Sequence, residues 1–137
     1  MSLNKVVEFL NANPVQYLAT VGRDGKAKCR PFMFAGELDG KLWFCTATNK
    51  DVYVQLEANP KFEASGWHPG QPWIVVTGEA DLEDTVSEAT RIAGYEHMTG
   101  LGETYEGPND PRLTFFSVKN GIAKIADIDG SERIIEL

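Results

Sequence analysis

Apolar and polar residues alternate along most of this chain, and the period of the alternation changes in a few places. Apolar residues with helical spacing occupy Leu3 to Leu10, and the Asn13-Pro14 pair predicts the end of that helix. Runs rich in aromatic and β-branched residues, typical of strands, follow at residues 16–21, 27–34, 41–45, 61–67 and 73–82. The pattern therefore predicts a protein built mainly from short strands.

Turn signatures indicate how these strands connect. The Asp24-Gly25 and Asp39-Gly40 pairs predict tight turns between the first three strands, and connections this short join antiparallel neighbours. The Asn120-Gly121 pair predicts a type I′ hairpin between strands at residues 113–118 and 122–128. A tail strand is expected at residues 133–137.

Helical spacing returns twice between the strands. The first segment runs from Asn49 to Ala58, with Thr48 or Asn49 as the expected N-cap. The second runs from about Asp84 to Ala93. Residues 94–111 are rich in Gly, Pro, Asn and Asp and predict a long loop, which in a compact domain is often functional.

Seven or so strands with a few short helices predict a mainly β fold. An antiparallel sheet of this size is expected to close into a small β-barrel, because an open sheet leaves edges prone to aggregation. The 137 residues are expected to form a single domain over 1–137, and the 42% apolar and 24% charged composition is typical of a globular protein.

Charge and composition narrow the function classes. With 13 Lys and Arg against 20 Asp and Glu, the net charge of −7 disfavours nucleic acid and anionic membranes as partners. No apolar run approaches the roughly 20 residues of a membrane span, and no secretory signal is visible, so a cytoplasmic protein is expected. Cys29 and Cys45 are expected to be free thiols, and with His68 and His97 they show no metal-ligand spacing.

Two cations stand out against this acidic background. Arg30 lies inside the second predicted strand, and Lys50 follows the hydroxyl-bearing run from Thr46 to Thr48 at a predicted helix start. Hydroxyls, helix N-terminal N–H groups and an ammonium together can bind a phosphate. The same residues also fit a simple helix cap, a surface lysine and an arginine that pairs across a sheet.

An ordered series of short motifs carries a resemblance to a known family. The motifs are Tyr17-Leu18-Ala19-Thr20, Asp24-Gly25, Arg30-Pro31-Phe32, Asp39-Gly40-Lys41-Leu42-Trp43-Phe44, Thr46 to Lys50, Gln55-Leu56, Asn59-Pro60 and Thr77-Gly78-Glu79-Ala80. Over about residues 3–82 the chain resembles the pyridoxamine 5'-phosphate oxidase-like FMN-binding split-barrel family. Beyond Asp84 the match is architectural only.

The resemblance implies a split β-barrel with Greek-key-like antiparallel order, in a homodimer that holds one FMN in each of two grooves between subunits. The cofactor-binding positions that it implies are Arg30, Pro31, Phe32, Met33, Cys45, Thr46, Thr48, Asn49, Lys50 and Trp73, with Lys50 as the phosphate ligand. Two of these depart from the family's usual pattern. Asn49 stands where an Arg is usual, and Trp73 stands where a Gln is usual.

The expected function is that of an FMN-dependent oxidoreductase that passes electrons between a reduced nicotinamide and an unidentified acceptor. No catalytic side chain is predicted, because the flavin performs the hydride chemistry and the protein positions it. Pyridoxamine phosphate itself is not the expected substrate. Two alternatives stay open: a non-catalytic module that binds flavin, haem or deazaflavin, and a structural dimer whose groove has been lost.

Overall fold

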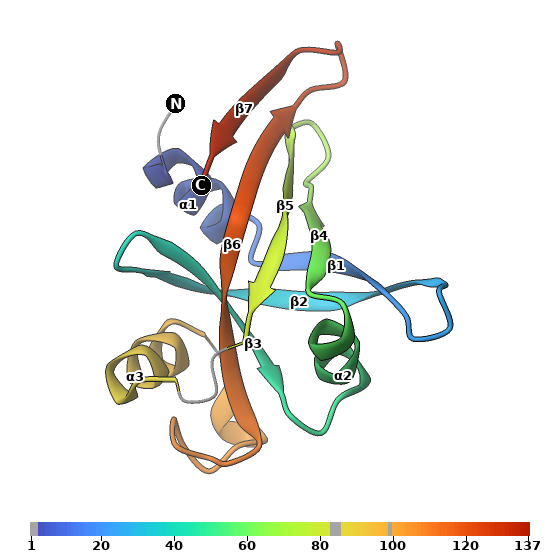
Figure 1. Cartoon of the computed structure of the whole chain (residues 1–137). Coiled ribbons are helices and arrows are strands. Elements are labelled where there is room, and N and C mark those ends of the chain that lie inside the picture. Colours follow the sequence, from blue (N-terminus) through green and yellow to red (C-terminus); the bar gives the residue numbers. More distant parts are fainter. Residues whose placement is uncertain (1–2, 83–85, 99) are drawn as a thin grey trace.

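The computed structural model describes residues 3–82, 86–98 and 100–137, which contain seven strands in one antiparallel sheet (Figure 1). The strands are β1 (Val15–Val21), β2 (Ala27–Leu38), β3 (Lys41–Ala47), β4 (Lys61–Gly66), β5 (Trp73–Asp81), β6 (Leu113–Ala126) and β7 (Glu132–Glu136). Their order is β3-β2-β1-β4-β5-β6-β7, and an additional β3–β6 pairing closes the first six strands into a barrel. The predicted mainly β split barrel is confirmed.

Two of the three predicted turns are confirmed. Asp39 and Gly40 both have left-handed backbones, with φ of 54° and 78°, as a type I′ turn between β2 and β3 requires. Gly25 also has a positive φ of 79° in the turn between β1 and β2. The β2 strand continues past the predicted end at Phe34, because a bulge between Phe34 and Gly36 lets it bend and keep pairing with β3.

The predicted hairpin at Asn120-Gly121 is wrong. These residues form a bulge in β6, which runs unbroken from Leu113 to Ala126 and pairs with β5 on both sides of the bulge. Asn120 has a φ of 52°, a left-handed conformation. Asn-Gly pairs adopt it in type I′ turns as well as in bulges, which is why the sequence predicted a turn here. A Cβ on Gly121 would lie 2.6 Å from Cγ1 of Val118, so only glycine fits this close approach.

The first two helices flank the barrel (Figure 1). In α1 (Leu3–Ala12), Val6 and Leu10 are fully buried in the core, as the apolar spacing predicts. In α2 (Asp51–Ala58), the N-cap residue is Lys50, and no side chain caps the helix. The predicted caps Thr48 and Asn49 are therefore wrong, because the chain still turns away from β3 at those residues.

The third helix, α3 (Glu88–His97), is capped by Ser87, whose Oγ accepts a hydrogen bond from the Thr90 N–H at 3.2 Å. The predicted start near Asp84 lies outside the described residues. The helix continues through Gly94, where a loop was predicted, because this glycine is buried against Phe115: a Cβ would lie 2.5 Å from the ring. A short 3₁₀ helix, η1 (Leu101–Glu103), follows. None of the helices in the described segments has the length and apolar character to cross a membrane.

The core consists of two apolar clusters. The barrel interior is aromatic, and the rings of Phe44, Phe62 and Phe116 contact one another with centroids 5.8 to 6.2 Å apart. A second cluster under α3 contains Trp43 and Phe115, which are also buried. Partly buried side chains from the segment after α3 pack against this second cluster, so the segment lies close to β3.

Candidate functional site

A cavity of about 310 Å³ lies between β2, β3, the start of α2 and the segment after α3; we call it the β2–β3 pocket. Its lining residues are Val15, Pro31, Phe32, Met33, Cys45, Thr46, Lys50, Met98, Leu101 and Tyr105. The lining is mostly apolar, with a few polar groups. This is the usual composition of a small-molecule site.

Six of the ten predicted cofactor-binding residues line this pocket. Pro31, Phe32 and Met33 come from β2, where they were expected as a consecutive set. Cys45 and Thr46 come from the end of β3, and Lys50 follows at the start of α2. The β3–α2 connection therefore brings hydroxyl, thiol and ammonium groups to one cavity.

Thr46 carries an unusual hydroxyl. Its side chain is 3% exposed, and its Oγ1 has no hydrogen-bond partner in the part of the chain that the structure describes. A buried hydroxyl without a partner costs free energy, and such groups in native proteins are often satisfied by a ligand or water. Thr46 is also one of the residues that line the β2–β3 pocket, so a hydroxyl without a partner lies in the pocket wall.

Lys50 places a positive charge at the same pocket. It is the N-cap residue of α2 and is exposed, so its ammonium is free to reach a ligand. The N-terminus of α2 adds a partial positive charge beside it. The end of the pocket next to α2 is therefore suited to an anion, within a chain whose net charge is −7.

Cys45 is a neutral thiol in this setting. Burial raises the pKa of the Cys45 thiol to about 12, although the Lys50 charge acts in the opposite direction. A thiol with this pKa is protonated at neutral pH and is a poor nucleophile. Cys45 and Cys29 are both free, as predicted from the sequence.

The other four predicted residues do not line the pocket. Arg30 points toward α2, where Nη2 donates to Gln55 Oε1 and Nη1 donates to Thr20 Oγ1, both at 2.7 Å. Thr48 and Asn49 are exposed. Trp73 begins β5 and pairs with Ala126. Their assignment as cofactor ligands stays a prediction.

The sequence prediction missed four lining residues: Val15, Met98, Leu101 and Tyr105. The last three belong to the predicted loop 94–111, whose length indicated a functional segment without identifying the residues. One signal was available. Met98, Leu101 and Tyr105 are the large apolar or aromatic side chains between residues 98 and 110, although no regular helix spans them: α3 ends at His97, and Gly100 has a left-handed backbone.

A hydrogen-bond network holds this segment in place. The Asp110 carboxylate accepts hydrogen bonds from the Glu106 and Arg112 backbone N–H groups, at 3.0 and 2.9 Å, and from the Arg112 guanidinium. These bonds hold the pKa of Asp110 well below its usual range. The Arg112 guanidinium also lies 5.2 Å from the ring centre of Tyr105, a cation–π contact that supports this pocket wall.

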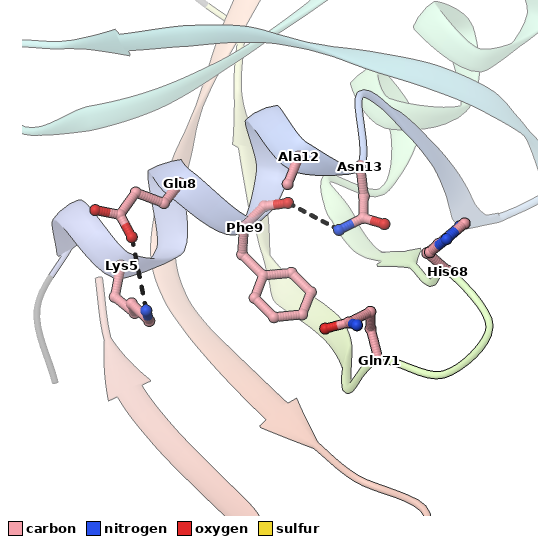
Figure 2. A pocket seen from close by; sticks show the side chains of 7 residues that line it. All are labelled: Lys5, Glu8, Phe9, Ala12, Asn13, His68 and Gln71. Atoms are coloured by element: carbon pink, nitrogen blue, oxygen red, sulfur yellow. Dashed lines mark hydrogen bonds and ion pairs between the residues drawn. The ribbon is translucent and has the colours of Figure 1, made fainter.

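The two histidines lie outside the pocket. His97 Nε2 is 2.9 Å from Asn11 Oδ1, and its ring packs edge-on against Phe34, so it joins α3 to α1 and β2. His68 lines a separate hollow of about 390 Å³ beside α1, where Phe9 projects toward the loop that carries Gln71 (Figure 2). The polar residues of that hollow are not buried. Among the described residues, no group of three His, Cys, Asp or Glu side chains could hold a metal ion.

Comparison with known proteins identifies the family of this chain. The family model described as pyridoxamine 5'-phosphate oxidase matches residues 3–121. The chain belongs to this family. The match extends past the predicted 3–82 and includes the segment that forms the far wall of the pocket.

Solved structures related to this pyridoxamine 5'-phosphate oxidase family member share its fold. A NimC/NimA family protein from Clostridium acetobutylicum is 27% identical, with a TM-score of 0.87 over 98% of this chain and 92% of that chain. A pyridoxamine 5'-phosphate oxidase-related, FMN-binding protein from Nostoc punctiforme is 16% identical, with a TM-score of 0.67 over 100% and 99%. A heme-binding protein from Mycobacterium smegmatis is 14% identical, with a TM-score of 0.75 over 99% and 58%. No curated protein sequence matches the chain.

Proposed function

We propose that the protein binds FMN in the β2–β3 pocket and acts as an oxidoreductase that takes electrons from a reduced nicotinamide nucleotide and passes them to an unidentified acceptor or substrate. One observation carries the proposal. The buried, unpartnered hydroxyl of Thr46 and the ammonium of Lys50 line one otherwise apolar cavity in a member of this family. A flat, amphipathic ring joined to a phosphate needs this combination of groups.

The residues present fit the two ends of FMN. Lys50 and the start of α2 would hold the phosphate, and Thr46 would donate a hydrogen bond beside it. Phe32, Met33 and Leu101 would contact the ring through apolar surface. The flavin, when bound, accepts or donates a hydride, and the neutral Cys45 thiol does not compete as a nucleophile.

We further propose a homodimer with the pocket at the subunit interface. The outer face of β1 exposes Val15, Tyr17 and Val21, with exposed fractions of 43%, 56% and 42%. Tyr17 pairs with Pro31 and Val15 pairs with Met33 on β2, which extends this apolar face. Val15, Pro31 and Met33 also line the pocket. A second copy that covers the face would therefore close the pocket as well.

Haem is the second candidate, because Met33, Met98 and Cys45 place three sulfur atoms around the pocket. Thioethers and thiolates are axial ligands of haem iron. All three sulfur atoms are possible ligands of this candidate, because iron binding would itself deprotonate the Cys45 thiol.

The visible absorption spectrum of the purified protein tests the proposal. We expect the chain, mixed with FMN and passed through a desalting column, to retain a flavin spectrum that NADH or NADPH bleaches without oxygen. A flavin spectrum that neither nucleotide bleaches would indicate a binding module without turnover. Retention of haemin but not of FMN would support the haem candidate and refute the proposed function.

A further inference from the structure

A closed triangle of hydrogen bonds joins α2 to β1 and β2. Nη2 of Arg30 donates to Oε1 of Gln55 at 2.7 Å, and Nη1 of Arg30 donates to Oγ1 of Thr20 at 2.7 Å. The Thr20 hydroxyl donates in turn to the same Oε1 of Gln55 at 2.7 Å. Nη1 of Arg30 also donates to the carbonyl oxygen of Leu18 at 3.2 Å. We call the three side chains of Arg30, Thr20 and Gln55 the α2 tether.

The chemistry of these groups allows one arrangement of the α2 tether. A guanidinium only donates hydrogen bonds, so the Gln55 atom that faces Arg30 is the amide oxygen. The Thr20 hydroxyl accepts from Arg30, so its own hydrogen is given to that oxygen. Thr20 is buried, and Arg30 and Gln55 are half-buried. The tether is therefore a directional link, and hydrogen bonds from a guanidinium are among the stronger ones.

The α2 helix has few other directional contacts with the barrel. It packs against β1 (Figure 1), and Val52 and Leu56 are buried in the core. Apolar burial is non-directional, so these two contacts alone allow small rotations of the helix. Within the described segments, Gln55 is the one α2 side chain that hydrogen-bonds to the sheet, and no side chain caps the first turn. The tether thus sets the rotation of α2 about its own axis.

The rotation of α2 decides where Lys50 points. Lys50 directly precedes Asp51, the first residue of α2, and it lines the β2–β3 pocket. Its N–H donates to the carbonyl oxygen of Ala47 at 3.1 Å, which fixes one end of the helix. Gln55 supplies a second fixed point about one turn further along the helix. Two fixed points determine the direction of a rigid helix, although Arg30 itself does not line the pocket.

We propose that Arg30 and Gln55 are positioning residues for the phosphate of FMN, because they hold α2 so that Lys50 and the first-turn N–H groups face the β2–β3 pocket. The inference rests on the proposed function, since it requires the FMN phosphate to lie beside Lys50. It gives Arg30 a role other than the direct contact with the cofactor that the sequence resemblance implies.

Two variants that keep the positive charge of residue 30 test the inference. Gln55→Met removes the acceptor at nearly the same side-chain length, and Arg30→Lys cannot bond to Leu18, Thr20 and Gln55 with the geometry of a guanidinium. We expect each variant to weaken FMN binding about fivefold to tenfold. Riboflavin binding should stay unchanged, because riboflavin lacks the phosphate. The double variant should lose no more than either single variant, since both changes break one link.

Titration of flavin fluorescence with the whole protein measures both ligands, and thermal unfolding without ligand shows whether each variant is folded. Val54→Met is the matched control. It places the same new side chain on the neighbouring residue of the helix, which is exposed and takes no part in the α2 tether. We expect this control to bind FMN like the wild type.

The outcomes separate the two proposals. If Gln55→Met binds FMN like the wild type, or loses no more than Val54→Met, the inference is refuted and the proposed function stands. Weaker FMN binding in Arg30→Lys alone would then indicate that Arg30 contacts the ligand directly. Equal loss of FMN and riboflavin would show that the tether supports the whole pocket, which also refutes the positioning role. If the wild type binds neither flavin, the proposed function fails and the inference fails with it.

Discussion

The guanidinium of Arg112 donates two hydrogen bonds to the carboxylate of Asp110, from Nε at 3.2 Å and from Nη2 at 2.8 Å. Nη2 also donates to the carbonyl oxygen of Thr104 at 2.9 Å. On the other side, the Thr48 N–H donates to the carbonyl oxygen of Arg112 at 2.8 Å. The pair thus ties the segment that bears Tyr105 to the end of β3.

Replacement of this carboxylate, Asp110→Asn, is expected to lower stability at pH 7. The native bonds depress the pKa of Asp110, so its stabilising contribution is present above the unfolded pKa of about 3.9 and is lost as the pH falls toward the lower native pKa. The difference between wild type and variant should therefore shrink in acid. Urea unfolding at pH 7 and at pH values below about 4 would measure this. A difference that stays constant with pH would contradict the role of the charge.

Thr46→Val is expected to raise the stability of the ligand-free protein and to weaken FMN binding. Valine has nearly the same shape and removes a buried hydroxyl that has no partner in the described chain, so the ligand-free protein should gain about 1 kcal/mol. FMN binding should weaken about threefold to tenfold, since the hydroxyl would no longer donate to the ligand. Thermal unfolding without FMN and titration with FMN measure the two effects. Unchanged FMN affinity would remove Thr46 from the site.

Lys50→Ala is expected to weaken FMN binding roughly tenfold to a hundredfold, because a charge-assisted contact of about 1.5 to 3 kcal/mol is lost. Riboflavin lacks the phosphate and should bind both proteins equally. Titration of flavin fluorescence with both ligands measures the contrast. Equal loss for both flavins would indicate a damaged pocket. Equal FMN affinity in both proteins would exclude Lys50 as the phosphate ligand.

Cys45 is expected to resist alkylation in the folded protein. With a thiol pKa of about 12, only about one molecule in ten thousand carries the thiolate at pH 8, whereas an unfolded cysteine is about one quarter ionised. Iodoacetamide labelling followed by peptide mass spectrometry should show labelling at Cys45 about a thousandfold faster in urea. Rapid labelling of Cys45 without urea would show that the thiol is open to solvent.

Tyr17→Glu is expected to separate the proposed dimer. Two copies of a buried carboxylate on an apolar face should raise the dimer dissociation constant at least about a hundredfold. Ile128→Glu is the control, because Ile128 is 90% exposed in the turn between β6 and β7, away from that face. Sedimentation velocity at micromolar concentration measures both variants. A stable monomer in the wild type would exclude the dimer altogether.

The sequence predicted the fold well where local chemistry decides the structure. The Asp39-Gly40 turn is local, since its left-handed residues can adopt only a few conformations. Asn120 has the same backbone signature, but its role as a bulge depends on β5 pairing along the whole of β6. Whether such a residue ends a strand or bends it is decided by a partner strand far away in the sequence.

The same distinction applies to the site. Residues in one strand, such as Pro31, Phe32 and Met33, could be predicted together because consecutive positions stay close in space. The opposite wall could not be predicted in this way. Tyr105 is held at the pocket by the bonds of Asp110 and Arg112, and these bonds join residues within an irregular segment. Arg30 was predicted to contact the cofactor, but its bond to Gln55 of α2 depends on how that helix packs, which the sequence around Arg30 does not determine.

The pairing of β6 with β3, β5 and β7 bears on the order in which the chain can fold during synthesis. Phe44 and Phe116 face each other across β3 and β6, although β6 is made after most of the barrel. A nascent chain that ends before Leu113 contains five barrel strands and no strand to close them, so β3 and β5 each keep an unpaired edge. The ribosome must therefore release β6 before the barrel can form, and until then two strand edges stay open to contact with other chains.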